Sequence, residues 1–201
     1  MDASRFQRAI ERIDAANAED PNTLAINGER RPKELTHARM LSEWIRRLRP
    51  DASEELLLAA RAHHIRRWAI ARDTFPAGRR GYLRWRTALH GLHAAETGEI
   101  LSEVGYAPEI VARVQQLVRK HNLRRDAEVQ TLEDGLCLVF LETQLSALRK
   151  EHPEDKIVDI LRKTWAKMSE TGRRLALELV LPREDRALVE RALDPVASAE
   201  D

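Results

Sequence analysis

Residues 53–71 read SEELLLAARAHHIRRWAIA, and this stretch is typical of an amphipathic α-helix. Asp51 or Ser53 is placed to cap its start. The glutamates fall in the expected first turn and the arginines toward the end, which is the distribution that the helix dipole favours. The stretch therefore predicts one helix that carries His63 and His64.

Helical periodicity continues along almost the whole chain, and no strand-type alternation of any length interrupts it. A loop rich in Pro, Asn and Gly is expected at 18–34, with Asn27-Gly28 as a turn signal. The other expected helices begin near Ser4, cover about 35–48, 82–104, 108–121, 126–150 and 152–172, and end with one that starts at Pro182. The sequence predicts an all-α, single-domain helical bundle over 1–201.

The composition is that of an ordinary soluble globular protein, with 33% charged and 43% hydrophobic residues. A formal net charge of +1 argues against a dedicated nucleic-acid binder. Cys137 is the only cysteine, so neither a disulfide framework nor a thiolate zinc site is expected. We expect no secretory signal, no membrane span and a cytoplasmic location. The sequence leaves the oligomeric state open.

Five separate helical segments carry residues that bind divalent transition ions well. Imidazole is a good ligand for such ions and carboxylate suits the harder ones. The candidate ligands are His37, His63, His64, His93, His121 and Asp134. Glu133 is a further candidate for a catalytic carboxylate, although adjacent helix residues point about 100° apart, so one of the two acids is expected to face a site.

Arginine and tryptophan form a second constellation around these histidines. Arginine matches phosphate or carboxylate with two parallel hydrogen bonds and stacks on aromatic rings. The candidates are Arg66 and Arg67 for charge neutralisation during catalysis, and Arg84, Arg86, Trp68 and Trp85 for substrate binding. Together they predict a small anionic substrate. The competing interpretation is that these arginines are solvated or paired with glutamates.

The order of the histidines and Asp134 resembles that of HD-type metal-dependent phosphohydrolases over about 34–147. The resemblance implies an HD-like core, packed by the N-terminal and C-terminal helices, and a divalent Mn, Fe, Co or Ni ion. One position departs from the pattern, because HD proteins have Asp where this chain has His64. An imidazole cannot bridge two ions through two oxygens, so a dinuclear site of the usual kind is not expected.

The strings DAANAEDPN, RRGYLRWRTALHGLHA, LEDGLCLVFLE and ILRKTWAKMSE also resemble a bacterial and fungal family known as domain of unknown function 4202. That resemblance covers nearly the whole chain and brings no established activity. Members of the family often carry Gln at position 63 and Lys at position 121, which moves interest to His64, His93, Glu133 and Asp134.

Three functions remain open from the sequence. The first is a divergent HD-like, metal-dependent hydrolase of a small anionic phosphoester, such as a nucleotide. The second is a non-catalytic helical module that binds an anion or a partner, in which the histidines and acids form a buried hydrogen-bond network. The third is an HD-type iron oxygenase, which depends even more on the carboxylate that His64 replaces.

Overall fold

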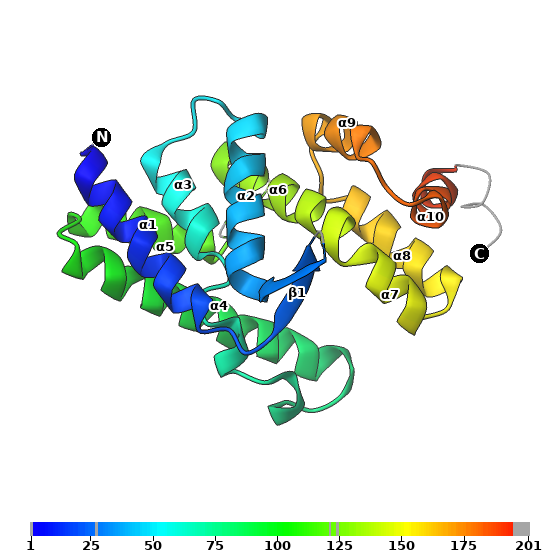
Figure 1. Ribbon diagram of the computed structural model, residues 1–201, viewed down its shortest axis with the longest axis horizontal. Helices are drawn as coiled ribbons and strands as arrows, with labels where there is room; N and C mark the ends of the chain where they lie inside the picture. Colours follow the sequence, from blue (N-terminus) through cyan, green and yellow to red (C-terminus); the bar gives the residue numbers. More distant parts are fainter. Residues whose placement is uncertain (1, 27, 121, 124, 195–201) are drawn as a thin grey trace. The chain divides into compact units, whose positions relative to one another are not determined.

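The computed structural model describes residues 2–26, 28–120, 122–123 and 125–194. The prediction of an all-α fold is confirmed (Figure 1). The helices are α1 (Ala3–Ala18), α2 (Lys33–Leu48), α3 (Glu54–Ala62), α4 (Gly78–Glu103), α5 (Pro108–Val118), α6 (Ala127–Thr143), α7 (Leu145–Glu151), α8 (Glu154–Trp165), α9 (Glu170–Glu178) and α10 (Arg183–Leu193). Two short 3₁₀ helices, η1 (Arg67–Ala69) and η2 (Arg72–Thr74), and two strands, β1 (Thr23–Ile26) and β2 (Glu29–Pro32), complete the chain.

The chain divides into two compact units, residues 1–132 and 133–201. In the first unit α3 packs against α1, α2 and α5, while α4 packs against α1 and α5. Leu56 and Leu58 of α3 are fully buried, and Ile13 and Ile45 meet the same core from α1 and α2. Helices with one apolar stripe must bury it against one another, which explains why α3 lies at the centre of this unit.

The second unit is held together by α7, α8 and α10, which pack against one another. Its apolar core includes Ile157, Leu161 and Leu188. Asp185 is also buried there, and it accepts a 2.8 Å hydrogen bond from Arg149 Nε. A buried carboxylate needs such a partner, so this ion pair fixes how α10 lies against α7.

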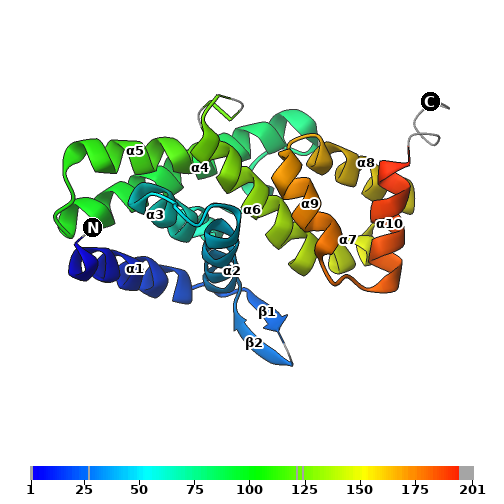
Figure 2. The same cartoon turned by 90° about the horizontal axis from the view of Figure 1, so that it is seen from above.

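The expected loop at 18–34 contains a β-hairpin, so the prediction of no strands is wrong for this segment. The strands β1 and β2 pair antiparallel, from Thr23 opposite Pro32 to Ile26 opposite Glu29 (Figure 2). Each strand is only four residues long, which is too short to give a clear period of two. Gly28 supplies the positive φ of 83° that the turn requires.

The predicted helix over 53–71 is also too long, because α3 ends at Ala62. Ser53 caps its start as expected, accepting a hydrogen bond from the Leu56 amide. After Ala62 the chain makes turns, and Arg66 takes a left-handed conformation with φ 49°. His63 and His64 therefore lie in a turn and not on a helix.

Three other predicted helices differ from those observed. The helix expected at 108–121 stops at Val118, just before Lys120 takes a φ of 55°. The helix expected at 126–150 is interrupted at Gln144, between α6 and α7. The helix expected at 152–172 ends at Trp165, and α9 starts anew with Ser169 as its cap.

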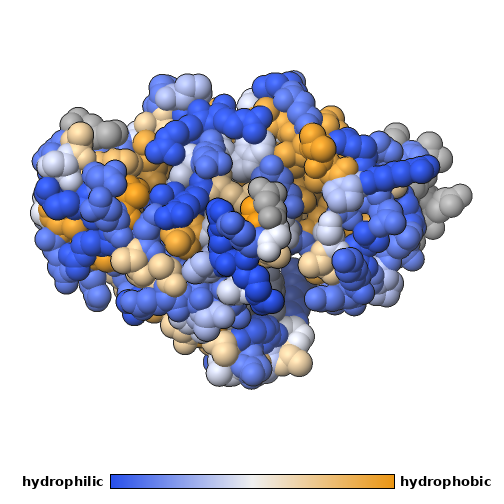
Figure 3. Space-filling model, viewed as in Figure 1, coloured by the Kyte–Doolittle hydropathy of each residue, from blue (hydrophilic) through white to orange (hydrophobic). Residues whose placement is uncertain are grey.

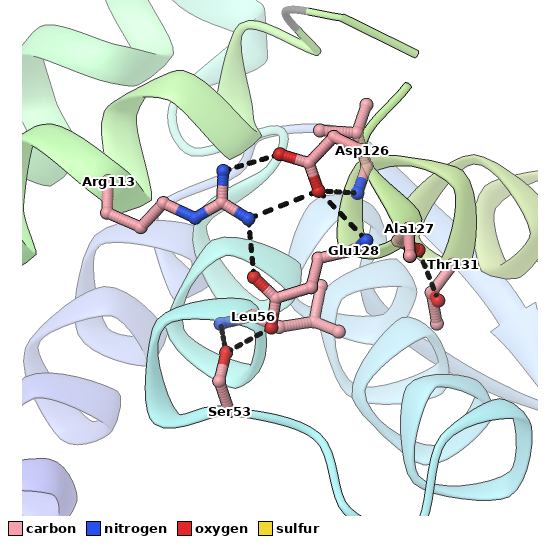
Figure 4. A network of polar contacts seen from close by, with 8 residues as sticks. Ser53, Leu56, Arg113, Asp126, Ala127, Glu128 and Thr131 are labelled. Atoms are coloured by element: carbon pink, nitrogen blue, oxygen red, sulfur yellow. Dashed lines mark hydrogen bonds and ion pairs between the residues drawn. The ribbon is translucent and has the colours of Figure 1, made fainter. Parts of the chain in front are cut away.

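A polar network joins the ends of three helices of the first unit (Figure 4). Arg113 of α5 donates hydrogen bonds to both Asp126 and Glu128 at 2.6 Å, and Ser53 donates to the other oxygen of Glu128. Asp126 in turn accepts from the first backbone amides of α6. The network satisfies helix-end donors and pins α3, α5 and α6 together.

None of the described helices combines the length and the apolarity that a bilayer crossing requires. On the face drawn in Figure 3, hydrophilic side chains dominate, and smaller hydrophobic areas lie between them.

Candidate functional site

Four of the predicted histidines gather in the first unit. They come from three separate segments of the chain. His37 comes from α2, His63 and His64 from the turn after α3, and His93 from α4. The rings of His63 and His64 lie 4.6 Å apart between centroids, and those of His64 and His93 lie 5.8 Å apart. All but His64 are buried.

Glu34, which the sequence did not single out, contacts two of these imidazoles. Its Oε2 atom is 3.3 Å from Nδ1 of His64 and 3.7 Å from Nδ1 of His37, one helical turn further along α2. Its backbone amide donates a 2.9 Å hydrogen bond to the buried Asp20, so the start of α2 is fixed as well. We call Glu34, His37, His63, His64 and His93 the histidine cluster.

The charge of Glu34 is set by its neighbours. Burial alone would raise the pKa of Glu34, but the contacts with His37 and His64 hold it well below its usual range. Glu34 is therefore an ionised carboxylate near neutral pH, and a carboxylate only accepts hydrogen bonds. It follows that Nδ1 of His64, which faces it, carries a proton.

His93 has a defined tautomer for a similar reason. Its Nδ1 lies 2.7 Å from the carbonyl oxygen of Ile65, and a carbonyl can only accept, so Nδ1 carries the proton. Burial, followed by the proximity of His64, lowers the pKa of His93 to about 3. The ring is neutral at pH 7, and its Nε2 is a lone pair that has no hydrogen-bond partner among the described residues.

Burial lowers the pKa of His63, His64 and His90 as well. Burial lowers the pKa of His63 well below its usual value, and His64 lowers it further. Burial also lowers the pKa of His64, against the opposing influence of Glu34. His90 of α4 is half-buried, and burial and then Arg86 lower its pKa to about 4. Such imidazoles are poor bases at pH 7 and serve better as lone-pair donors.

Arg67, a predicted site residue, borders the cluster. Its Nε lies 3.9 Å from Oε1 of Glu34, and its guanidinium carbon lies 4.8 Å above the Trp85 ring. Trp85 is itself fixed by a 2.9 Å hydrogen bond from its Nε1 to the carbonyl of Ile70. Burial lowers the pKa of Arg67, and the nearby Arg86 also acts in that direction.

The other predicted arginines and tryptophans differ in their partners and in their exposure. Arg86 lies near Tyr82, with 5.9 Å between its guanidinium carbon and the ring centroid, and forms no ion pair with a described carboxylate. Arg66 instead forms ion pairs with Glu19 at 3.3 Å and with Glu96 at 3.6 Å, so its charge is already balanced by carboxylates of the same unit. The side chain of Arg84 is exposed, and that of Trp68 is half-buried.

The predicted ligand Asp134 belongs to the second unit and has a structural task there. It accepts hydrogen bonds from the backbone amide of Ser169 at 2.8 Å and from the Ser169 hydroxyl at 2.5 Å, at the cap of α9. Glu133, its neighbour, lies 3.8 Å from Lys167. His121 lies outside the described residues. That these three residues join the histidines stays a prediction.

The fit of the cluster to a metal ion is partial. His64 and His93 each hold Nδ1 against an acceptor and leave Nε2 as a lone pair, an arrangement typical of histidines that bind metals. However, in the part of the chain that the structure describes, no three His, Cys, Asp or Glu side chains are placed to hold one ion. As described, the residues do not fit a catalytic ion, which needs at least three protein ligands.

The fold and the site define a helical protein in which four histidines gather near one buried carboxylate. The chain belongs to the family described as a domain of unknown function (DUF4202), which matches residues 7–189. Neither a curated protein nor a solved structure matches the chain.

Proposed function

We propose that the protein binds a small phosphate-bearing anion beside the histidine cluster. The observation that carries the proposal is an excess of positive charge around a single carboxylate. Arg67 and Arg86 lie close enough to lower the pKa of His90, and Lys120 contributes in the same direction. Glu34 is the one carboxylate with which Arg67 forms an ion pair among the described residues, and the 3.9 Å separation is long. We call Arg67 and Arg86 the cationic rim.

The exposure and the contacts of the Arg67 side chain support this proposal. It is about one-third exposed, and its guanidinium makes no hydrogen bond with the described residues. The Trp85 ring holds it in place at 4.8 Å. An arginine that is fixed by stacking, partly desolvated and still rich in unused donors is well suited to bind phosphate through two hydrogen bonds.

Binding of inorganic phosphate tests the proposal directly. In titration calorimetry with a chelator present, we expect wild-type protein to bind phosphate and Arg67→Ala to bind it at least about 10-fold more weakly, because a charge-assisted pair is worth roughly 1.5–3 kcal/mol. Arg79→Ala is the matched control, since Arg79 is exposed in the first turn of α4. Equal affinity in the Arg67 and Arg79 variants, or no binding by wild-type protein, would contradict the proposal.

A second candidate function is the metal-dependent hydrolysis of a phosphoester, as the HD-like order of the histidines implies. It is favoured by the fixed Nδ1 atoms of His64 and His93, which leave two lone pairs for an ion. No catalytic step is assigned to it, because the described residues do not supply three ligands. No observation favours the iron-oxygenase alternative.

Metal analysis distinguishes the two candidates. If the protein is a metal-dependent hydrolase, purified protein contains about one Mn, Fe, Co or Ni ion per chain, or takes one up, because neutral imidazole is a strong ligand for these ions. The ion should then be required for phosphoester hydrolysis. Protein that stays free of metal after dialysis against each ion, and that still binds phosphate, would exclude this candidate and retain the first.

A further inference from the structure

The buried end of the site is lined by hydrogen-bond acceptors. His93 is only 1% exposed, and its Nε2 has no donor among the described residues. Oε2 of the ionised Glu34 lies in the same cluster, 3.3 Å from His64. Buried acceptors in native proteins nearly always meet a donor, so an unmatched one at this position indicates a guest that supplies it.

Arg86 of the cationic rim and this acceptor lie on one face of α4. Arg86, His90 and His93 follow one another at spacings of four and three residues, which places them in one stripe of a helix. Their burial increases along the stripe, from half-buried Arg86 and His90 to buried His93. Seven residues of helix span about 10 Å. A guest that reaches from the rim to His93 is therefore larger than a bare phosphate ion.

The burial of His93 selects the kind of donor. An ammonium group would have to give up its hydration to reach this ring, which is only 1% exposed, and burying a charge costs far more than burying a neutral polar group. A neutral hydroxyl donates a hydrogen bond without that cost. A phosphate group is disfavoured at this place, because its negative charge would lie beside the ionised carboxylate of Glu34.

We infer that the ligand is a phosphorylated polyol, such as a sugar phosphate, whose phosphate binds Arg67 and Arg86 and whose hydroxyl donates to Nε2 of His93. The inference rests on the proposed anion binding and adds the class of the ligand. His93 is a specificity-determining residue in this arrangement, and the fixed proton on its Nδ1 keeps Nε2 an acceptor.

Titration calorimetry with four probes tests the inference, with a chelator present throughout. We expect ribose 5-phosphate to bind at least about 10-fold more tightly than inorganic phosphate, in line with one additional buried hydrogen bond. Ribose alone should show no measurable binding, and phosphoethanolamine should bind no better than phosphate. In His93→Leu the ratio of the two phosphate affinities should fall to about one, and in His93→Gln, which keeps an acceptor, it should recover in part.

The outcomes that overturn the inference differ from those that overturn anion binding. Equal affinities of phosphate and ribose 5-phosphate in wild-type protein, or an unchanged ratio in His93→Leu, would overturn the hydroxyl contact while leaving phosphate binding at Arg67 intact. So would a preference that appears only after Mn²⁺ is added, since a metal would then occupy Nε2. If wild-type protein does not bind phosphate at all, that result contradicts the proposed anion binding instead.

Nitrogen-15 NMR of wild-type protein keeps the inference testable if the His93 variants do not fold. The Nε2 resonance of His93 should move upfield when ribose 5-phosphate is added, because the lone pair then accepts a hydrogen bond. Inorganic phosphate should leave it in place. A resonance that stays unmoved at saturating ribose 5-phosphate would contradict the contact.

Discussion

Replacing Glu34 with alanine should lower the free energy of unfolding by about 4 kcal/mol. The loss has two parts: a buried hydrogen-bond donor left without its acceptor costs roughly 1–3 kcal/mol, and truncating a buried side chain adds the cost of a cavity. Glu34 is 5% exposed, and Nδ1 atoms of His64 and His37 face its Oε2. Without the carboxylate, these polar groups stay buried beside a cavity. For a chain of this size the midpoint of thermal unfolding should fall by roughly 8–16 °C.

Two further variants separate the charge of Glu34 from its volume. Glu34→Gln keeps the shape and one acceptor, so about half of the loss is expected. Glu29→Ala removes an exposed acid from β2, whose ion pair with Arg31 is solvated, and should change the stability by less than about 0.5 kcal/mol. Urea-induced unfolding followed by circular dichroism measures all three. A Glu34→Ala variant as stable as Glu29→Ala would show that the carboxylate does not hold the cluster together.

Replacing Gly81 with alanine should destabilise the protein by about 3 kcal/mol, the upper end of what overpacking a closed site costs. A Cβ atom at Gly81 would lie 1.8 Å from the carbonyl oxygen of Pro76, which is far inside van der Waals contact. That carbonyl cannot move freely, because Arg72 donates hydrogen bonds to it at 3.1 Å and to the carbonyl of Phe75 at 3.0 Å. The segment between η2 and α4 would have to shift.

Gly91 offers the matched control in the same helix. A Cβ atom there meets nothing within 4 Å, so Gly91→Ala should stabilise the protein by up to about 1 kcal/mol through helix propensity alone. Thermal unfolding of the two variants should therefore move in opposite directions. If Gly81→Ala unfolds at the wild-type temperature, the close approach of the Pro76 carbonyl to α4 is wrong.

The helices were predictable because apolar periodicity is a local property, whereas their ends were set by tertiary structure. α3 stops at Ala62, shortly before Arg66 takes a left-handed conformation, although no residue at 63–66 is a helix breaker. The break before α9 also depends on a contact that is distant in the sequence. The cap of that helix involves Asp134, which lies 35 residues from Ser169 and has no visible relation to it in the sequence.

The histidines of the candidate site were predictable from their order, but the groups that control them were not. Glu34 lies in the first turn of α2, where an acid is expected from the helix dipole alone, so its burial has no signature in the sequence. His90 had a signal that we did not use, namely its place between Arg86 and His93 on one helical face. Which nitrogen of each ring is free depends on distant acceptors, such as the carbonyl of Ile65.

The central claim is that the neutral imidazoles of His64 and His93 present unprotonated Nε2 atoms next to the cationic rim. Long-range nitrogen–proton correlation spectra of the imidazole rings at pH 7 test it most directly. For His64 and His93 the account predicts neutral rings with the proton on Nδ1 and an unprotonated Nε2. A cationic ring at either position, or a proton on Nε2 of His93, would contradict it, because no lone pair would then face a guest.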